Sequence, residues 1–370
     1  MTILIIGLLL VAYSFLTKKK YNPYIGFLFP LLIMGFQSGV QGDYQSYMAD
    51  FSFGGAGSTT KVTEFAWLAM NELFQPLGFP AMVFFMSLVE CSICAYFVKH
   101  YVTKDKQWLG AILFFFSVSC MLIQMKAMRQ GMAMEFALLS FMFTEKRKFI
   151  PAVITASLSF GFHNSAIVIL CIWVIYFISK LGTSYHIPVI SKMLHKYENK
   201  SIGSWFAIGC VVACFAIYLL KQTIVDVYLM PLAMSNDNFD YSGYLDEMGS
   251  NKLALWLMVS FSIKAYVFAL LIAKNKKYRI FSFLVLMSIF VNMMFFGFGN
   301  LMRIANYYTL FTIAVVPIVC SFMEQNFKKG KTYSMLFLLM YFVIELRTTL
   351  PWLLGNGDDS FETYRFIFFD

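Results

Sequence analysis

Long apolar stretches alternate with short polar breaks along the whole chain. Twelve apolar segments can be delimited: residues 2–17, 21–40, 79–98, 108–125, 130–143, 149–162, 164–179, 201–220, 253–273, 280–299, 304–323 and 332–350. A helix that crosses a bilayer needs about 20 predominantly apolar residues, and most of these segments approach that length. The pattern predicts an all-α, polytopic integral membrane protein with about 12 transmembrane helices, forming one domain over residues 1–370.

The composition supports this prediction. Apolar residues make up 59% of the chain and charged residues 13%, with a mean hydropathy of +0.68. A typical soluble domain carries about 25% charged residues. A water-solvated globule and a separate cytosolic catalytic domain are therefore not expected.

Lysines mark alternate junctions between the apolar segments. Twenty of the 29 lysines and arginines fall in residues 18–20, 99–106, 146–148, 180–200, 274–279 and 328–331. The positive-inside rule makes these junctions cytoplasmic and places both termini outside. The same rule explains the net charge of +9, so nucleic-acid binding is not expected. Lys18 to Lys20 follow the first apolar run, an order typical of a first span and not of a signal peptide.

Neither a metal nor a cofactor is expected. All seven cysteines lie inside apolar runs, where cysteine acts as a small hydrophobe, and this includes the Cys91-x-x-Cys94 pair. Walker A, GxGxxG, GxSxG and HExxH motifs are absent from the sequence, as is any Asp-x-Asp. One histidine on the outer side cannot assemble a zinc site by itself.

Arginine is distributed differently from lysine. Four of the six arginines, Arg129, Arg303, Arg347 and Arg365, fall on or near the predicted outer side. The planar guanidinium matches phosphate and carboxylate through paired hydrogen bonds, whereas lysine is a point charge. The outer arginines are therefore predicted to bind an anion. The alternative is that they snorkel or pair with acids such as Glu135 and Glu345.

Three outer segments combine acids, amides and aromatic rings: residues 41–78, residues 221–252 and the tail from residue 351 to 370. The first contains Asp43, Tyr44, Tyr47, Asp50 and Glu64, and the tail contains Tyr364 and Arg365. Carboxylates that accept hydroxyl hydrogen bonds under aromatic rings suit a sugar ligand. The alternative is an ordinary solvated loop with an interfacial aromatic belt.

Two short motifs are candidate anion sites. In one, Lys126, Arg129 and Ala133 would share a face if residues 126–133 were helical, and Gln130 lies beside them. A helix N-terminus there would add positive potential. In the other, Arg303, Asn306 and Tyr307 repeat the spacing at the start of the eleventh segment. Ionisable groups at membrane depth are costly, which favours a functional interpretation of both arginines.

His163, in Gly161-Phe162-His163-Asn164-Ser165, is the one histidine predicted outside. A neutral imidazole is a natural general base near pH 7, although a histidine in such a turn can also simply bond a helix terminus. Glu90, Glu135, Glu345 and Lys264 lie within apolar runs. We expect them to hold the bundle together; a proton or ion path is the alternative.

Six motifs in order resemble the EpsG-like group of Wzy-type polysaccharide polymerases. They are Asp43-Tyr44-x-x-Tyr47, Glu64-Phe65, Arg129-Gln130-x-x-Ala133, Phe162-His163-Asn164-Ser165, Arg303-x-x-Asn306-Tyr307 and Tyr364-Arg365-Phe366. The resemblance spans nearly the whole chain. Residues 221–252 depart from it, since they match none of these motifs.

The resemblance implies a GT-C-like helical bundle in the bacterial inner (plasma) membrane. It implies inverting, metal-independent glycosyl transfer at the outer face between two oligosaccharides linked to undecaprenyl diphosphate, with membrane lipids, a flippase and a chain-length regulator as partners. The implied catalytic residues are Arg129, Arg303 and His163, with Asp43 or Glu64 as the alternative base. The implied substrate-binding residues are Lys126, Gln130, Tyr44, Tyr47, Asn306, Tyr307, Tyr364 and Arg365. Alternatives are an O-antigen ligase or another lipid-phosphate-sugar glycosyltransferase, a flippase, and a membrane acyltransferase.

Overall fold

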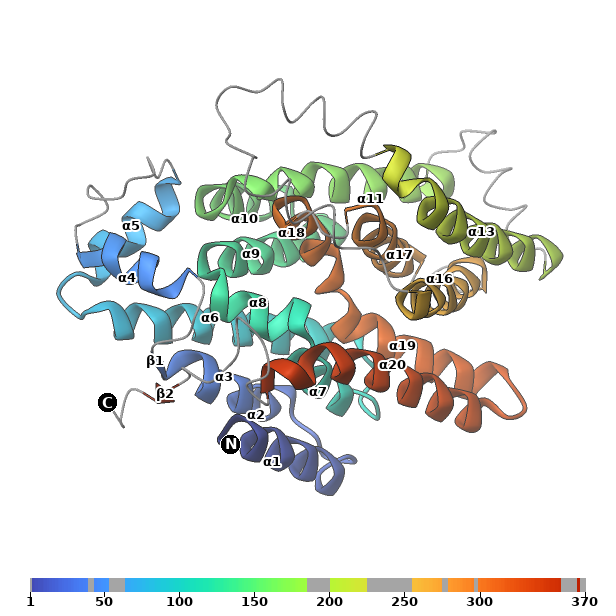
Figure 1. Cartoon of the computed structure of the whole chain (residues 1–370), viewed down its shortest axis with the longest axis horizontal. Helices are drawn as coiled ribbons and strands as arrows, with labels where there is room; N and C mark the ends of the chain where they lie inside the picture. Colours follow the sequence, from blue (N-terminus) through green and yellow to red (C-terminus); the bar gives the residue numbers. More distant parts are fainter. Residues whose placement is uncertain are drawn as a thin grey trace. The chain divides into compact units, whose positions relative to one another are not determined.

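A computed structural model describes residues 2–38, 43–52, 64–184, 200–224, 255–274, 279–295, 299–353 and 365–366 (Figure 1). The all-α prediction is confirmed for these residues, whose β structure is one antiparallel pair of two-residue strands, β1 (Gln37–Ser38) and β2 (Arg365–Phe366). The chain divides into two compact units. Unit 1 comprises Met1–Trp173 with Leu310–Asp370, and unit 2 comprises Val174–Thr309. Unit 1 is therefore discontinuous in sequence, with unit 2 inserted into it. The expected single domain over residues 1–370 stays a prediction.

The helices of unit 1 follow the predicted segments closely. They are α1 (Thr2–Leu16), α2 (Pro23–Gly26), α3 (Leu28–Gly35), α4 (Tyr44–Ser52), α5 (Phe65–Phe74), α6 (Phe79–Tyr101), α7 (Trp108–Phe115), the π-helix η1 (Val118–Leu122), α8 (Ile123–Lys126), α9 (Met128–Glu145), α10 (Phe149–Phe162), the 3-10 helix η2 (Asn164–Ile167), α19 (Thr312–Asn326) and α20 (Gly330–Leu353). The remaining helices are α11 (Val168–Ser184), which begins in unit 1, α13 (Lys200–Ile224), α16 (Leu255–Lys274), α17 (Arg279–Met294) and α18 (Gly299–Thr309).

Every one of the twelve apolar segments contains a helix. Among the described residues, α6 alone is long and apolar enough to cross a bilayer unaided, and the number rises to at most three if two bent helix pairs each count as one span. Seven more apolar helices have 10–17 residues within the described ranges. The total of twelve spans therefore stays a prediction.

Local sequence signals fix several helix starts. Gly78, with φ of 84°, turns the chain into α6, and Pro80 follows in the first turn, where its missing N–H is not needed. Asn22 caps α2 by accepting a hydrogen bond from the Tyr24 amide at 3.1 Å, and Pro23 is the first helical residue. These signals place both helices where the hydrophobic pattern predicts them.

The core of unit 1 lies where α6, α9 and α19 meet. Helix α9 packs against both α6 and α10, and these three helices lie side by side (Figure 1). Phe311, just before α19, meets Phe97 of α6 and Phe141 of α9 edge-on, with ring centroids 5.7 and 5.1 Å apart. All three rings are fully buried, so they fix the helices that carry the candidate site.

The predicted span 108–125 is not one helix. It is broken into α7 and the η1–α8 segment, which meet at 65°. The carbonyl of Phe116, freed by the break, accepts a hydrogen bond from the Thr349 hydroxyl of α20 at 2.8 Å. A second break falls at Ala127, whose ψ of 65° is not helical. The predicted shared helix face of Lys126 and Arg129 is therefore wrong, because Lys126 ends α8 and Arg129 lies in the first turn of α9.

The lysine-rich junctions of unit 1 gather at one end. Lys18, after α1, lies 5.1 Å from the ring centre of Trp108 at the start of α7. Lys106 forms an ion pair of 2.6 Å with Glu324 of α19. Tyr101, the last residue of α6, donates to Glu145, the last residue of α9, at 2.6 Å. Within unit 1, this clustering agrees with the predicted common side for the lysines.

Unit 2 is built from helices that pack through small residues. Helix α13 packs on α16, α16 on α17, and α17 on α18. The buried face of α13 carries Ala207, Cys210 and Cys214, and that of α16 carries Met258 and Ala265. Small residues allow close helix approach in membrane proteins. These contacts account for the spacing of small residues in both apolar segments.

Candidate functional site

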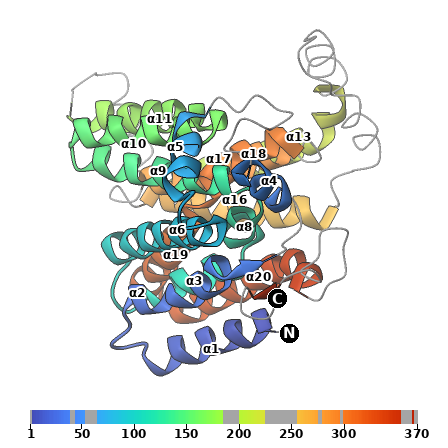
Figure 2. The ribbon, with the colours of Figure 1, turned by 90° about the vertical axis from the view of Figure 1, so that its left-hand side faces the viewer.

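Two helices lie in the first outer segment, where the sequence predicted a long loop. Tyr44, Tyr47 and Phe51 form the buried face of α4, at helical spacing. Helix α5 buries Trp67 and Phe74. Figure 2, viewed from the side of these helices, shows α4 and α5 in front of the bundle. The i, i+3, i+7 spacing of the α4 aromatics was a signal for this helix.

Aromatic contacts fasten α4 and α5 to the start of α6. The Tyr44 and Phe51 rings pack against Phe79, with centroids 5.3 and 5.5 Å away. The Tyr47 ring packs on Trp67 at 5.1 Å. Because Phe79 begins α6, these contacts lie at the end of unit 1 away from Lys99 and Tyr101.

The centre of the site is an ion pair between Glu64 and Arg129. Glu64 directly precedes α5 and Arg129 lies in the first turn of α9; Nη1 of Arg129 is 2.7 Å from Oε2 of Glu64. Both side chains are largely buried, with 9% of Glu64 and 21% of Arg129 exposed. Arg129 therefore pairs with an acid, as the alternative interpretation of the outer arginines allowed, but the acid is Glu64 and not one of those named there.

Aromatic rings surround the guanidinium. Its central carbon lies 5.3 Å from the ring centre of Tyr47 and 6.0 Å from that of Trp67, distances typical of cation–π contact. The Tyr47 hydroxyl donates to Oδ2 of Asp43 at 3.3 Å. Trp67 is not among the predicted site residues, because an isolated tryptophan in an outer segment is also typical of an interfacial aromatic belt.

One donor of Arg129 is not used within the site. Nε is buried and forms no hydrogen bond to the residues that the structure describes. An unsatisfied buried donor costs about 1–3 kcal/mol, and more when the group is charged. The guanidinium therefore retains hydrogen-bonding capacity for an acceptor, and an anion would satisfy it best.

His163 caps a short helix. Its Nδ1 accepts a hydrogen bond from the Ser165 amide at 3.1 Å and lies 2.7 Å from the Ser165 hydroxyl, which closes the first turn of η2. An imidazole whose Nδ1 accepts a hydrogen bond carries its proton on Nε2 when neutral. The Nε2 of neutral His163 is therefore a donor in this geometry.

The turn that carries His163 is linked to α5. A Cβ added to Gly161 would lie 2.4–2.8 Å from the ring of Phe65, so glycine is needed for this ring to approach. Phe65 directly follows Glu64 and is 55% exposed. It lines an open cavity of about 400 Å³ together with residues of α10 and α11, among them Phe160, Leu170 and Trp173. An apolar hollow is thus lined by the residue that directly follows Glu64.

Backbone pairing brings two residues of the tail to β1, which ends just before the first outer segment. Arg365 pairs with Ser38, and Phe366 with Gln37, in the β1–β2 ladder. The Tyr44 hydroxyl donates to the Gln37 carbonyl at 3.3 Å. The role of Arg365 as a substrate-binding residue stays a prediction. Tyr364 lies outside the described residues, as does the whole segment 225–254.

A second polar cluster lies deeper, between α6, α8 and α9. Glu135 accepts hydrogen bonds from Gln124 at 2.8 Å and from Cys94 at 3.0 Å. Glu90 is buried nearby, and a Cβ on Gly131 would lie 2.6 Å from its Oε1. Gln130, also fully buried, follows Arg129 on α9, and half-buried Lys126 ends α8. The cluster joins three helices, as expected for a structural role.

The second arginine motif belongs to unit 2. Arg303, Asn306 and Tyr307 lie on α18, at the helical spacing that the sequence predicts. Tyr307 is buried, whereas Arg303 and Asn306 are half-buried. Among the described residues, no group of three histidine, cysteine or acidic side chains is arranged to hold a metal ion. Metal independence itself stays a prediction.

The comparison with family models supports the resemblance to the EpsG-like group. The EpsG family model matches residues 20–353. No curated protein and no solved structure matches the sequence significantly. The family match covers Asp43, Glu64, Arg129, His163 and Arg303 and about nine-tenths of the length. The chain therefore belongs to the EpsG family.

Proposed function

We propose that the protein is a Wzy-type polymerase. It would join oligosaccharide repeat units linked to undecaprenyl diphosphate by inverting, metal-independent glycosyl transfer at the outer face of the bacterial inner membrane. Membership of the EpsG family suggests a polysaccharide-polymerase-like function, and the family and the apolar helices together indicate a membrane protein. The observation that carries the proposal is the buried Arg129 guanidinium, with its unused Nε donor, paired to Glu64 under aromatic rings.

Arg129 is assigned to the leaving group. In the reaction, a sugar hydroxyl of one lipid-linked unit attacks the anomeric carbon of a second chain. The bond from that carbon to the diphosphate oxygen breaks, and undecaprenyl diphosphate leaves with the electron pair. Negative charge grows on the departing diphosphate, and a fixed guanidinium in a largely water-excluded position stabilises it most effectively. The start of α9 adds the positive end of a helix dipole at the same place.

Glu64 is assigned as the base that takes the proton of the attacking hydroxyl. The sequence favoured His163 and kept Asp43 and Glu64 as alternatives. The cap formed by His163 occupies its Nδ1 lone pair and leaves Nε2–H as a donor, so a proton could enter only by breaking the cap. Glu64 is a carboxylate beside the phosphate-binding group, with one oxygen engaged by Arg129. His163 is then assigned to donate a hydrogen bond to a sugar or phosphate oxygen.

The surrounding groups suit the other parts of a lipid-linked sugar. The Asp43 carboxylate, which accepts a hydrogen bond from Tyr47, is suited to bind sugar hydroxyls, and the buried rings of Tyr47 and Trp67 hold the guanidinium beside it. The cavity beside Phe65 is apolar and open and suits the first isoprene units next to the diphosphate. A headgroup at Arg129 and a tail in this cavity would place both ends of one ligand in adjoining regions of unit 1.

The remaining assignments are retained as parts of the proposal. Arg303, Asn306 and Tyr307 are a second candidate phosphate-binding group, and Lys126, Gln130, Tyr44, Tyr364 and Arg365 are candidate substrate-binding residues. A flippase that delivers the lipid-linked unit and a chain-length regulator are the candidate protein partners.

The test is polymerisation of purified lipid-linked repeat units by the full-length protein, with product length read on a gel and lipid binding measured separately. Arg129→Lys should weaken binding of the lipid diphosphate and abolish most polymer formation. Lysine keeps the positive charge but cannot form the paired hydrogen bonds of a guanidinium. Glu64→Gln should keep or raise binding while slowing transfer about 100- to 10,000-fold. Arg147→Lys, the same change at the exposed lysine-rich end, is the matched control.

Two results would contradict the proposal. Normal polymer formation by both Arg129→Lys and Glu64→Gln would contradict the roles proposed for these two residues. Transfer of preassembled polymer to a lipid acceptor, without elongation of repeat units, would favour a ligase.

A further inference from the structure

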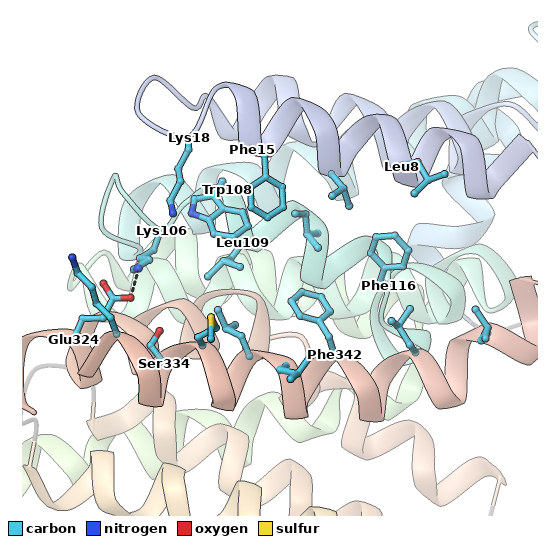
Figure 3. A pocket seen from close by; sticks show the side chains of 18 of the residues that line it. Leu8, Phe15, Lys18, Lys106, Trp108, Leu109, Phe116, Glu324, Ser334 and Phe342 are labelled. Carbon is cyan, nitrogen blue, oxygen red and sulfur yellow. Dashed lines mark hydrogen bonds and ion pairs between the residues drawn. The ribbon is translucent and has the colours of Figure 1, made fainter. Parts of the chain in front are cut away.

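A long apolar groove lies on another part of unit 1, between α1 and α20, with α7 at its base (Figure 3). Its volume is about 760 Å³, well within the range of small-molecule sites. Apolar side chains line most of it, including Leu8 and Phe15 of α1, Phe116 after α7, and Leu339 and Phe342 of α20. Leu8, Phe15 and Leu339 are exposed, so the groove opens to its surroundings.

One end of the groove is basic. Lys18, Lys106 and Lys331 line it, and Glu324 is the one acid in the lining. Figure 3 shows Lys18, Lys106 and Glu324 gathered at this end, with Leu8 and Phe116 toward the other. Glu324 is engaged by Lys106 at 2.6 Å, so the lining carries a net charge of about +2. Exposed Lys19 and Lys329 lie close by in sequence and add to the field.

The dimensions match one lipid chain. From Lys18 back to Leu4, both of which line the groove, the 14-residue separation corresponds to about 21 Å along a helix. One leaflet of the hydrocarbon core is about 15 Å thick. Trp108, under Lys18 at 5.1 Å, is a residue typical of the membrane–water interface. The basic end therefore fits the headgroup level, and the apolar length extends into the bilayer.

We propose that this groove binds a glycerophospholipid with an anionic headgroup, drawn from the leaflet on the lysine-rich side. The phosphate would lie at Lys18 and Lys331, and one acyl chain would fill the space between α1 and α20. Basic pockets between membrane helices on the cytoplasmic side are known to select anionic lipids. The basic end of the groove lies at the lysine-rich end of unit 1, where α9 ends at Glu145. Arg129 lies at the opposite end of α9. This inference is independent of the proposed enzymatic function.

Lipid titration of the delipidated full-length protein, followed by native mass spectrometry, tests the proposal. Phosphatidylglycerol and phosphatidylcholine with identical acyl chains are the probes. We expect phosphatidylglycerol to bind at least tenfold more tightly. Lys18→Gln with Lys331→Gln should reduce that preference about 30-fold at most, since each lysine near a membrane surface contributes about 1 kcal/mol. Lys19→Gln with Lys329→Gln removes the same charge outside the lining and should preserve most of the preference.

A second pair of variants tests the apolar part. Val11→Trp fills the groove without changing charge and should lower binding of both lipids. Leu16→Trp, on the same helix but outside the lining, is the control. Photoactivatable phosphatidylglycerol should label peptides of α1 and α20. Equal binding of the two lipids, equal effects of the two lysine pairs, or labelling confined to other helices would overturn the proposal. Preferential binding of a polyprenyl phosphate over phosphatidylglycerol would also overturn it.

Discussion

Arg129 and Glu64 are 65 positions apart in the chain, yet their side chains meet at 2.7 Å. Each partner compensates the charge that the other brings into a largely buried position. The pair also holds the start of α5 against the start of α9. Helix α9, which supplies the partner of Glu64, also contributes Glu135 to the deeper polar cluster.

This relationship predicts a strongly non-additive effect on stability. Glu64→Ala and Arg129→Ala should each destabilise the protein by about 1–3 kcal/mol, because each leaves a partly buried group without its partner. The double variant should cost little more than either single change. Thermal unfolding of the four proteins in one detergent measures the coupling. Additive effects would show that the ion pair contributes nothing beyond its separate side chains.

His163 is predicted to have two separable roles. His163→Ala should destabilise the protein by about 1 kcal/mol through loss of the cap on η2, whereas His163→Asn should keep the cap, because asparagine is among the best N-cap residues. Both changes remove Nε2–H and should reduce polymer formation alike. If His163→Asn restores polymerisation together with stability, the histidine acts only as a cap.

Gly131 is predicted to be indispensable for packing. A Cβ there would meet Oε1 of Glu90 at 2.6 Å and the backbone of Gln124 at 3.0 Å. Gly131→Ala should therefore destabilise by about 1–3 kcal/mol. Gly209→Ala is the matched control, since nothing lies within 4 Å of the added carbon, and it should stabilise α13 by about 0.5–1 kcal/mol. Equal melting temperatures for the two variants would contradict the close approach of Glu90.

The topology is predicted to place Lys19, Lys148 and Lys329 on the cytoplasmic side. Single cysteines at these positions, in a Cys171→Ser background that removes the one exposed native thiol among the seven, should react with a membrane-impermeant maleimide only after the cells are opened. A reporter that requires export, fused after Asp370, should be active. Labelling of any of the three cysteines in intact cells would reverse the assignment for its junction.

Polymerisation is predicted to survive chelation. EDTA should leave the rate unchanged, because the proposed leaving-group stabilisation comes from guanidinium groups. Loss of activity that magnesium or manganese restores would require a metal at the carboxylates, with Asp43 as the first residue to test.

The sequence was sufficient to locate the helices and much of the candidate site. Continuous apolar runs predict helical segments by length and hydropathy, and each of the twelve contains a helix within the described residues. Gly78 and Pro80 signalled the start of α6, and the chemistry of Arg129 and Glu64 marked both as candidates. Helices α4 and α5 were missed, although the aromatics of α4 have helical spacing, because the acids and amides of the segment resemble a solvated loop.

Other features depend on contacts that local patterns do not contain. The breaks at Phe116 and Ala127 involve neither glycine nor proline; the first is stabilised by Thr349, 233 positions later in the chain. The Glu64–Arg129 pair is likewise long-range, so the two residues were first assigned separate roles. The tautomer of His163 depends on the geometry of Ser165, which spacing alone does not specify.

The packing of α4 on α5 has an evolutionary consequence. Tyr47 on Trp67 holds the two helices together across residues 53–63, so insertions or deletions in that connection need not displace the Arg129–Glu64 pair. Members of the family would then be free to change the length and sequence of this connection while the ion pair stayed under purifying selection.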